Sequence, residues 1–414
     1  MPTLHETTRK RICRLGFFLL CLAPTVVTSG WIGSHYLPGS HERLEASLAE
    51  RLRVTPKLAA QQNPKPGLTR FSFATLADFA AANQVELRKL GDLHVVQIKE
   101  ASLKLESLGE LLKVAAREWE SPTAEPLLLR IEVLNIDSKR GDETKNELAL
   151  HNVRLQVDRV GEFERLRLAA QLDPNEANAI SALVQQEADG TWRAKLDASA
   201  TALPVRLLSY CAPVLKGLEG KFRGKIRWDS RGEQIVGFAQ GTITGNKLSD
   251  YLPGRFPQDA TGEALVELEE LAFVGDRIQR LNGALQVESG ELSARLFAEI
   301  EKKLWCRPQA ENLATPGIQP QQSIPFDRLA VRMVFNEKGF SLWGDLPEDA
   351  GRVDARLMVR DGKALLLQPA WVDFSAGYWV QFAVGETPTA MPVSREAIEL
   401  ARRLPAPAKE KTAK

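Results

Sequence analysis

The stretch LNGALQVESGELSARLF, residues 281–297, carries the clearest pattern in this 414-residue sequence. Apolar residues alternate with polar ones on both sides of a central Ser-Gly pair. Alternation with a period of two places the apolar side chains on one face of a strand, and Ser-Gly is a common turn pair. The pattern therefore predicts a β-hairpin over residues 282–296. Its large apolar side chains would share one face; they are Leu285, Val287, Leu292 and Leu296.

The same alternation recurs over much of the chain, with glycine, proline and Asp-Asn clusters between the segments. Half-buried antiparallel strands have this pattern, so we expect a mainly β protein with a long antiparallel sheet. The expected strands cover residues 68–73, 85–90, 93–98, 101–105, 127–133, 148–157, 166–172, 221–228, 235–242, 263–273, 327–335, 340–344, 353–359 and 364–367. A few capping helices are expected near residues 107–119, 203–215 and 393–404.

A sheet with one apolar face must cover that face with a second sheet, with helices or with lipid. The alternation alone fits a closed sandwich and an open groove equally well. In the sandwich the apolar face is ordinary core, whereas in the groove it is a binding surface.

An apolar segment near the N-terminus, LGFFLLCLAPTVVTSGWI at residues 15–32, contains no charged residue. A helix of this length covers roughly 27 Å, close to the ~30 Å hydrocarbon core of a bilayer. Four basic residues precede it, Arg9, Lys10, Arg11 and Arg14, and they favour a cytoplasmic N-terminus. We expect a single-pass anchor in the inner membrane, oriented N-in, with the bulk of the chain in the periplasm. The alternative interpretation is a cleaved signal peptide.

Composition excludes some classes of function. The chain carries 54 Lys and Arg against 53 Asp and Glu, a net charge of +1, so no nucleic-acid partner is expected. Four cysteines are too few for a disulfide scaffold. Cys211 and Cys306 are the two that lie beyond the N-terminal segment, and the sequence leaves open whether they pair or are simply buried.

No motif for catalysis, for a metal or for a cofactor is present with the required spacing. The segment from Gly217 to Lys221 lacks the glycine spacing of a phosphate-binding loop. His94 and His151 each stand alone within an expected strand, which favours a core or surface histidine over a zinc ligand. We therefore expect a protein that is not an enzyme and has no cofactor.

One further stretch carries a family resemblance: LPVRLLSYCAPVLKGLEGKFRGKIRW, residues 203–228. It has a Leu-Pro start before a short helix, then Leu218, Gly220 and Gly224 where a strand begins. With the order of anchor, helix and sheet, and with residues 281–297, the chain resembles the AsmA-like family of bacterial envelope proteins, including its TamB-related members. These motifs mark strand and turn positions and carry no active-site residue.

The resemblance implies a long twisted antiparallel sheet curled into a groove, and a role in envelope biogenesis or in phospholipid transfer and maintenance. It favours the groove over the sandwich. Phospholipid acyl chains would then be the partner, and Leu285, Val287, Leu292 and Leu296 are candidates to line the groove. The alternative is a structural or assembly scaffold that binds envelope proteins through exposed sheet edges.

The expected organisation has five parts. A basic cytoplasmic N-terminus at residues 1–14 precedes the transmembrane anchor at 15–37. A β-rich part with helices follows at 38–202, then an AsmA-like C-terminal β part at 203–392. A closing helix and a solvated tail make up residues 393–414.

Overall fold

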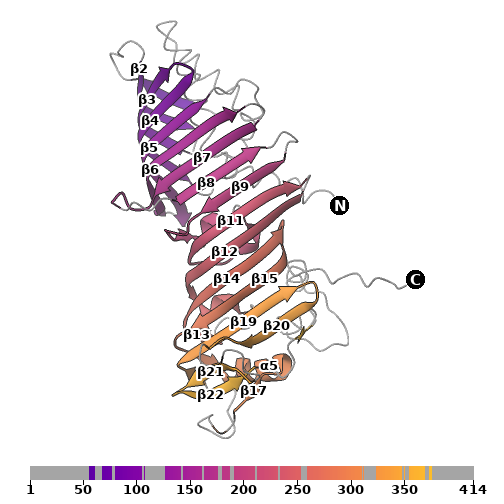
Figure 1. The fold of residues 1–414 in the computed structure, drawn as a ribbon. Coiled ribbons are helices and arrows are strands. Elements are labelled where there is room, and N and C mark those ends of the chain that lie inside the picture. The colour runs from indigo at the N-terminus through magenta and orange to yellow at the C-terminus, as the bar shows by residue number, and fades with distance from the viewer. Residues whose placement is uncertain are drawn as a thin grey trace, which may run out of the picture. The chain divides into compact units, whose positions relative to one another are not determined.

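The fold was analysed in a computed structural model of the chain (Figure 1). The structure describes residues 56–60, 68–76, 80–104, 107, 126–140, 143–160, 163–175, 180–186, 191–209, 212–231, 234–252, 259–309, 311, 323–346, 349, 354–368 and 373–374. The predicted anchor at 15–37 and the predicted helices at 107–119 and 393–404 lie outside these residues, apart from residue 107. Among the described residues, no helix has the length and apolar character needed to cross a bilayer.

The protein is mainly β, as predicted, with one large sheet, a second sheet of three strands and few helices. The large sheet is mixed and not purely antiparallel, because β4 and β5 pair in parallel. The chain divides into two compact units, residues 1–201 with 227–235, and residues 202–226 with 236–414.

Nine consecutive strands lie in the first unit (Figure 1). They are β1 Pro56–Ala60, β2 Leu68–Leu76, β3 Ala80–Leu90, β4 Leu93–Lys104, β5 Leu127–Arg140, β6 Glu143–Val160, β7 Phe163–Gln171, β8 Ile180–Gln186 and β9 Trp192–Asp197. Each pairs with the next, antiparallel except for β4 with β5. The expected strands at 85–90 and 93–98 are confirmed and joined by a tight turn: Leu90 pairs with Leu93, and Gly91 has a φ of 62°, which glycine adopts without strain.

Five of these strands change their buried face at the same level of the sheet. Phe71, Val85, Ile98, Ile131 and Val153 form one buried rung across β2 to β6, and a second buried rung is formed by Ala74, Ala82, Ala101, Leu134 and Leu150. The two rungs are three residues apart on every strand, although positions i and i+3 of a regular strand face opposite sides. Each strand therefore breaks its alternation once between the two rungs, and these breaks align across the sheet because the pairing register continues unchanged through them.

The second unit contains the remaining elements, with the tips of β11 and β12 assigned to the first unit. Its strands are β10 Leu203–Pro204, β11 Lys221–Arg231, β12 Gln234–Lys247, β13 Ala260–Thr261, β14 Glu263–Val274, β15 Arg277–Val287, β16 Gly290–Ser293, β17 Arg307–Pro308, β18 Ser323–Phe326, β19 Arg328–Asn336, β20 Gly339–Gly344, β21 Arg356–Arg360, β22 Lys363–Leu367 and β23 Asp373–Phe374. Its helical elements are α4 Val205–Leu208, η2 Pro213–Leu215, η3 Leu248–Tyr251 and α5 Ala294–Leu304.

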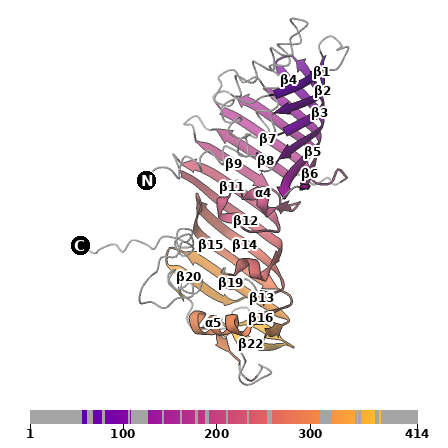
Figure 2. The same ribbon diagram turned by 180° about the vertical axis from the view of Figure 1, so that it is seen from behind.

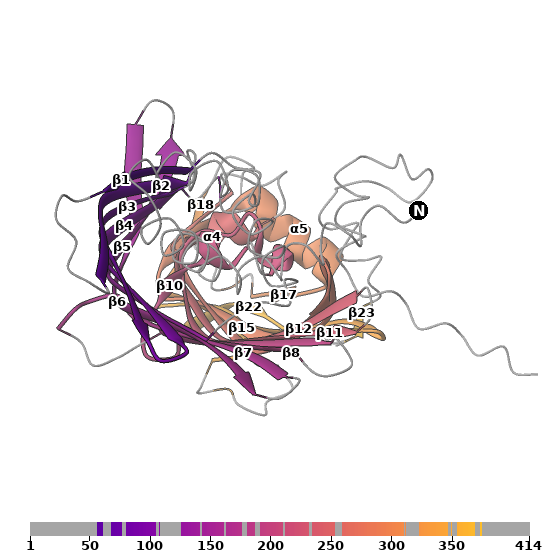
Figure 3. The same ribbon diagram turned by 90° about the horizontal axis from the view of Figure 1, so that it is seen from above.

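The strands expected at 221–228, 235–242 and 263–273 are confirmed as β11, β12 and β14. The helix expected over 203–215 is present only as two short pieces, α4 and η2, after the two-residue strand β10. Viewed from behind, α4 lies over the neighbouring strands of its unit (Figure 2). From above, α4 and α5 lie on the same side of β11, β12 and β15 (Figure 3).

The hairpin predicted over residues 282–296 is wrong. Strand β15 ends at Val287 and pairs with β14 and β19, whereas β16 pairs with β13 and β18 in the three-stranded sheet. The chain then becomes helical, because the Ser293 hydroxyl accepts a hydrogen bond from the Leu296 backbone N–H and caps the first turn of α5. Leu292 and Leu296 are therefore not strand partners of Leu285 and Val287.

Two positions of the family-like pattern must be glycine for steric reasons. A β-carbon on Gly224 would lie 2.1 Å from the carbonyl oxygen of Gln240 and 2.6 Å from the Cα of Gly241, and one on Gly220 would lie 2.3 Å from the carbonyl oxygen of Thr244. A side chain at either position would therefore collide with the backbone of β12. Only glycine allows the start of β11 to approach its neighbour this closely.

Candidate functional site

An apolar cavity of about 160 Å³ lies within the second unit, between one face of the sheet and the segment that contains η2. Its wall contains Leu285, one of the four predicted groove residues. The lining residues are Val214, Leu215, Leu218, Ile243, Tyr251, Val266, Leu268, Leu271, Ile278, Leu281, Gly283, Ala284, Leu285 and Met333. We refer to this space as the apolar cavity.

Two adjacent rungs of the sheet supply its floor. Ile243, Val266 and Leu285 are directly paired across β12, β14 and β15 and form the first rung. In the second rung, Leu268 pairs with Gly283. Gly283 has no side chain, and a β-carbon there would lie 2.4 Å from the carbonyl oxygen of Glu267. This position must therefore be glycine. Because the neighbouring side chains are large and glycine has none, unfilled space remains above the sheet at this position.

The opposite wall is formed by Val214, Leu215 and Leu218. Backbone hydrogen bonds hold this segment in successive tight turns, since the N–H of Leu215 donates to the oxygen of Ala212 at 2.9 Å and that of Leu218 donates to Leu215 at 3.2 Å. Irregular backbone of this kind packs less completely against a sheet than a regular helix does. The apolar face of the sheet is therefore covered here by protein, with room left beneath the cover.

Tyr251 brings a polar group to the wall of the cavity. Its hydroxyl oxygen accepts a hydrogen bond of 2.6 Å from Nδ2 of Asn246, which is itself buried. The pKa of Tyr251 is raised to about 12, mainly by burial; the Asn246 hydrogen bond opposes this rise, and the neighbouring Asp250 carboxylate adds a smaller increase. The phenol therefore stays neutral throughout the physiological range of pH, and the cavity wall carries no charge from it.

The structure separates the four predicted groove residues. Leu285 is 9% exposed and faces the cavity, while Val287 is buried further along the same strand. Leu292 lies in β16, where it pairs with Ala260 and with a residue of β18, and Leu296 lies in the first turn of α5. All four are buried, but only Leu285 lines the apolar cavity.

Sequence reasoning missed the η2 segment as one wall of the site. Apolar residues recur at helical spacing over 203–214, and this pattern did point to a covering helix. It gave no indication that Val214, Leu215 and Leu218 would lie opposite Leu285, because that contact joins positions about seventy residues apart in the sequence.

The two histidines and the cysteine considered in the sequence lie in separate segments of the described chain. No group of three or more His, Cys, Asp or Glu side chains there is arranged to hold a metal ion. His94 is buried within β4, and His151 lies in β6. Cys306 is a free, buried thiol, and burial raises its pKa to about 12. Cys211, its suggested partner, lies outside the described residues.

Comparison of the chain with protein-family models, with curated proteins and with solved structures gives no match.

Proposed function

We propose that this chain is a non-enzymatic envelope protein of the AsmA-like type that handles membrane phospholipid and holds part of an acyl chain in the apolar cavity. The observation that carries the proposal is the cavity itself, apolar on both walls and bounded by Leu285 on the sheet and Leu215 on the η2 segment. The proposal includes an inner-membrane anchor at residues 15–37, with the N-terminus in the cytoplasm and the bulk of the chain in the periplasm.

The size of the cavity fits a short apolar group. An engineered protein cavity of ~150 Å³ stays dry and binds benzene, so a space of about 160 Å³ can hold the end of a hydrocarbon chain but not a whole lipid. Each CH₂ group that leaves water for such a site contributes about 0.8 kcal/mol. A few methylene groups would give weak, reversible binding, which suits a protein that must release its lipid.

Filling the cavity tests this proposal. Val266→Phe places a larger apolar side chain in the floor, at a position that is 8% exposed. Leu265→Phe is the matched control, since Leu265 is the adjacent residue of β14, is 37% exposed and does not line the cavity. Lipid co-purified with each full-length protein would be extracted and quantified by mass spectrometry, and binding of a fluorescent fatty acid would be titrated in parallel.

We expect the Val266→Phe protein to lose fatty-acid binding and co-purified lipid, and the Leu265→Phe protein to retain both. Equal lipid content in the two folded variants would refute the cavity as the binding site. A parent protein that carries no lipid but captures an envelope protein would favour the alternative, an assembly scaffold.

The topology is tested separately with an alkaline phosphatase, which is active only outside the cytoplasm, fused after Lys414. The four basic residues before residue 15 predict an active fusion. A stable but inactive fusion would place the C-terminus in the cytoplasm and contradict the proposed localisation. Retention of Arg14 in the purified protein would distinguish an anchor from a cleaved signal peptide.

A further inference from the structure

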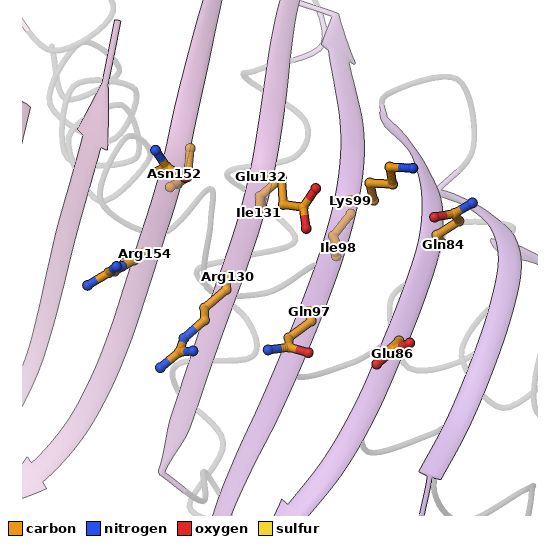
Figure 4. Close-up of a pocket in the computed structure, with 11 residues that line it drawn as sticks. Gln84, Glu86, Gln97, Ile98, Lys99, Arg130, Ile131, Glu132, Asn152 and Arg154 are labelled. Carbon is orange, nitrogen blue, oxygen red and sulfur yellow. The ribbon is translucent and has the colours of Figure 1, made fainter. Parts of the chain in front are cut away.

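A polar hollow of about 310 Å³ lies on the sheet of the first unit, in the region of the aligned breaks in alternation. Side chains from four adjacent strands, β3 to β6, line it (Figure 4). The lining residues are Gln84, Glu86, Gln97, Ile98, Lys99, Arg130, Ile131, Glu132, Asn152, Val153 and Arg154. Their charged members are three cations, Lys99, Arg130 and Arg154, and two carboxylates, Glu86 and Glu132.

Four of these residues form one rung across the sheet. Glu86 pairs with Gln97, Gln97 with Arg130, and Arg130 with Arg154. Residues that are directly paired share a face of the sheet, so these side chains stand side by side, as Figure 4 shows. On the far side of Arg154 the rung continues to Ala169 of β7, whose small side chain leaves the space beside Arg154 open.

The pairing of Arg130 with Arg154 brings two like charges together. Directly opposite residues in an antiparallel pair have β-carbons roughly 5 Å apart, and like charges at this spacing destabilise a sheet. Among the described residues, no carboxylate lies within ion-pairing distance of either guanidinium group. Glu86 is 3.0 Å from Arg88 and is thus already paired. Glu132 lies two positions beyond Arg130 on β5 and also lines the hollow.

Elsewhere in the same unit, the protein provides a counter-ion for neighbouring arginines. Asp229, whose side chain is 14% exposed, accepts from Nε of Arg193 at 3.3 Å and from Nη2 of Arg227 at 2.6 Å. Two guanidinium groups there share one carboxylate. Arg130 and Arg154 are both exposed, and among the described residues they have no carboxylate that pairs with them in this way.

We propose that Arg130 and Arg154 form a binding site for a phosphate-type oxyanion, which bridges the two guanidinium groups within the hollow. Two planar guanidinium groups on adjacent strands can each donate a pair of hydrogen bonds to one phosphate, and hydrogen bonds of this charged type are the strong ones. The neighbouring amide of Gln97 can donate to the same anion. The phosphate can belong to an anionic lipid headgroup or to a free phosphate ion. This site is independent of the apolar cavity, which lies in the other unit.

The test uses Arg130→Gln and Arg154→Gln in the full-length protein. Arg167→Gln is the matched control, because this substitution removes the same charge from an exposed arginine. Arg167 pairs with Gln156 on β6 and does not line the hollow. Binding of inorganic phosphate is measured by isothermal titration calorimetry. Binding to phosphatidylcholine vesicles with and without phosphatidylglycerol is measured by flotation.

We expect each hollow variant to weaken binding about tenfold or more, the loss of one charged hydrogen-bonded contact, and Arg167→Gln to change it less than about twofold. Loss in both the phosphate and the vesicle measurements identifies the lipid headgroup as a ligand, and loss in the phosphate measurement alone identifies free phosphate. Loss with the phosphatidylglycerol vesicles alone also supports a headgroup. Absence of binding in both measurements, or equal binding by all four proteins, overturns the proposal.

Gln97→Glu provides a second variant that does not depend on removing an arginine. Its carboxylate would lie beside Arg130 in the same rung and act as an internal counter-ion. We expect this protein to bind phosphate at least tenfold more weakly than the parent, because the anion and the new carboxylate compete for one guanidinium group. Unchanged phosphate affinity in this variant would contradict the proposed site.

Discussion

Replacement of Leu285 by aspartate tests whether the apolar face of the second unit is closed core or is open to water. Leu285 is 9% exposed, so the substitution loses most of the ~1.5–3 kcal/mol that burial of a leucine contributes. A carboxyl group buried to this extent has its pKa raised by about 3 units, and each unit corresponds to ~1.36 kcal/mol. The total is about 6 kcal/mol at pH 7, comparable with the whole stability of ~5–15 kcal/mol of an ordinary domain.

The pH dependence of this loss has a definite sign. Because the pKa of the new carboxyl group is higher in the folded than in the unfolded protein, its charge penalty is absent below about pH 4, where both states are protonated. The penalty grows between the unfolded-state pKa, about 4, and the folded-state pKa, near 7, and is constant above it. We therefore expect the Leu285→Asp protein to be less stable at pH 8 than at pH 5, relative to the parent.

Urea unfolding followed by circular dichroism at pH 5 and pH 8 measures both effects. Gln286→Asp is the control, since Gln286 is the next residue of β15, is only partly buried and pairs with the exposed Leu265. It should lose less than about 1 kcal/mol, as is usual for surface substitutions. Equal unfolding midpoints for the two variants at pH 8 would show that Leu285 is hydrated, and the closed wall described above would be wrong.

Three further predictions concern other buried groups. Asp349→Asn should cost about 3 kcal/mol in urea unfolding, because the buried carboxylate accepts from Nε of Arg356 at 2.6 Å and from its backbone N–H at 3.0 Å. Gly224→Ala should cost on the order of 2 kcal/mol in the same assay, since its β-carbon would meet the backbone of β12 near Gly241. Cys306, whose pKa burial raises to about 12, should react with iodoacetamide at pH 8 roughly a thousandfold more slowly in the native than in the unfolded protein, as mass spectrometry of its peptide would show.

The strands of the second unit could be predicted because one face of their sheet is buried and the other is exposed to solvent. In β14, buried and exposed residues alternate regularly from Glu263 to Leu268, and the same alternation of apolar and polar residues is visible in the sequence. The parallel pairing of β4 with β5 could not be predicted in this way. It joins His94 to Leu127 across an intervening segment, and a period of two contains no information on strand direction.

The failure of the predicted hairpin has a local cause. Leu292, Ala294 and Leu296 alternate with polar residues, but Ala294, Phe297 and Leu304 also fit one side of a helix, and all of them are buried. Ser293 favours the helix over the strand, because its hydroxyl caps the first turn of the helix. A serine followed by an apolar residue three positions later is too common a sequence to predict a helix start without the tertiary contacts.

The aligned breaks in alternation left a weak signal in the sequence. The buried residues of each strand switch from a spacing of two to a spacing of three, as in Ile98 to Ala101 and Ile131 to Leu134. In the sequence of a single strand, such a change of spacing is indistinguishable from the end of that strand. It becomes interpretable only when neighbouring strands are aligned, because the steps then fall at one level of the sheet.

The two proposed sites arise from opposite departures from ordinary sheet packing. In the apolar cavity, Gly283 leaves one position of a rung without a side chain, so the deficit is one of volume and an apolar group would fill it. In the polar hollow, Arg130 and Arg154 place two like charges in one rung, so the deficit is one of charge and an anion would balance it. Salt screens the second interaction and leaves the first almost unaffected. Binding that weakens as the salt concentration rises can therefore be assigned to the hollow. Binding that is independent of the salt concentration can be assigned to the cavity.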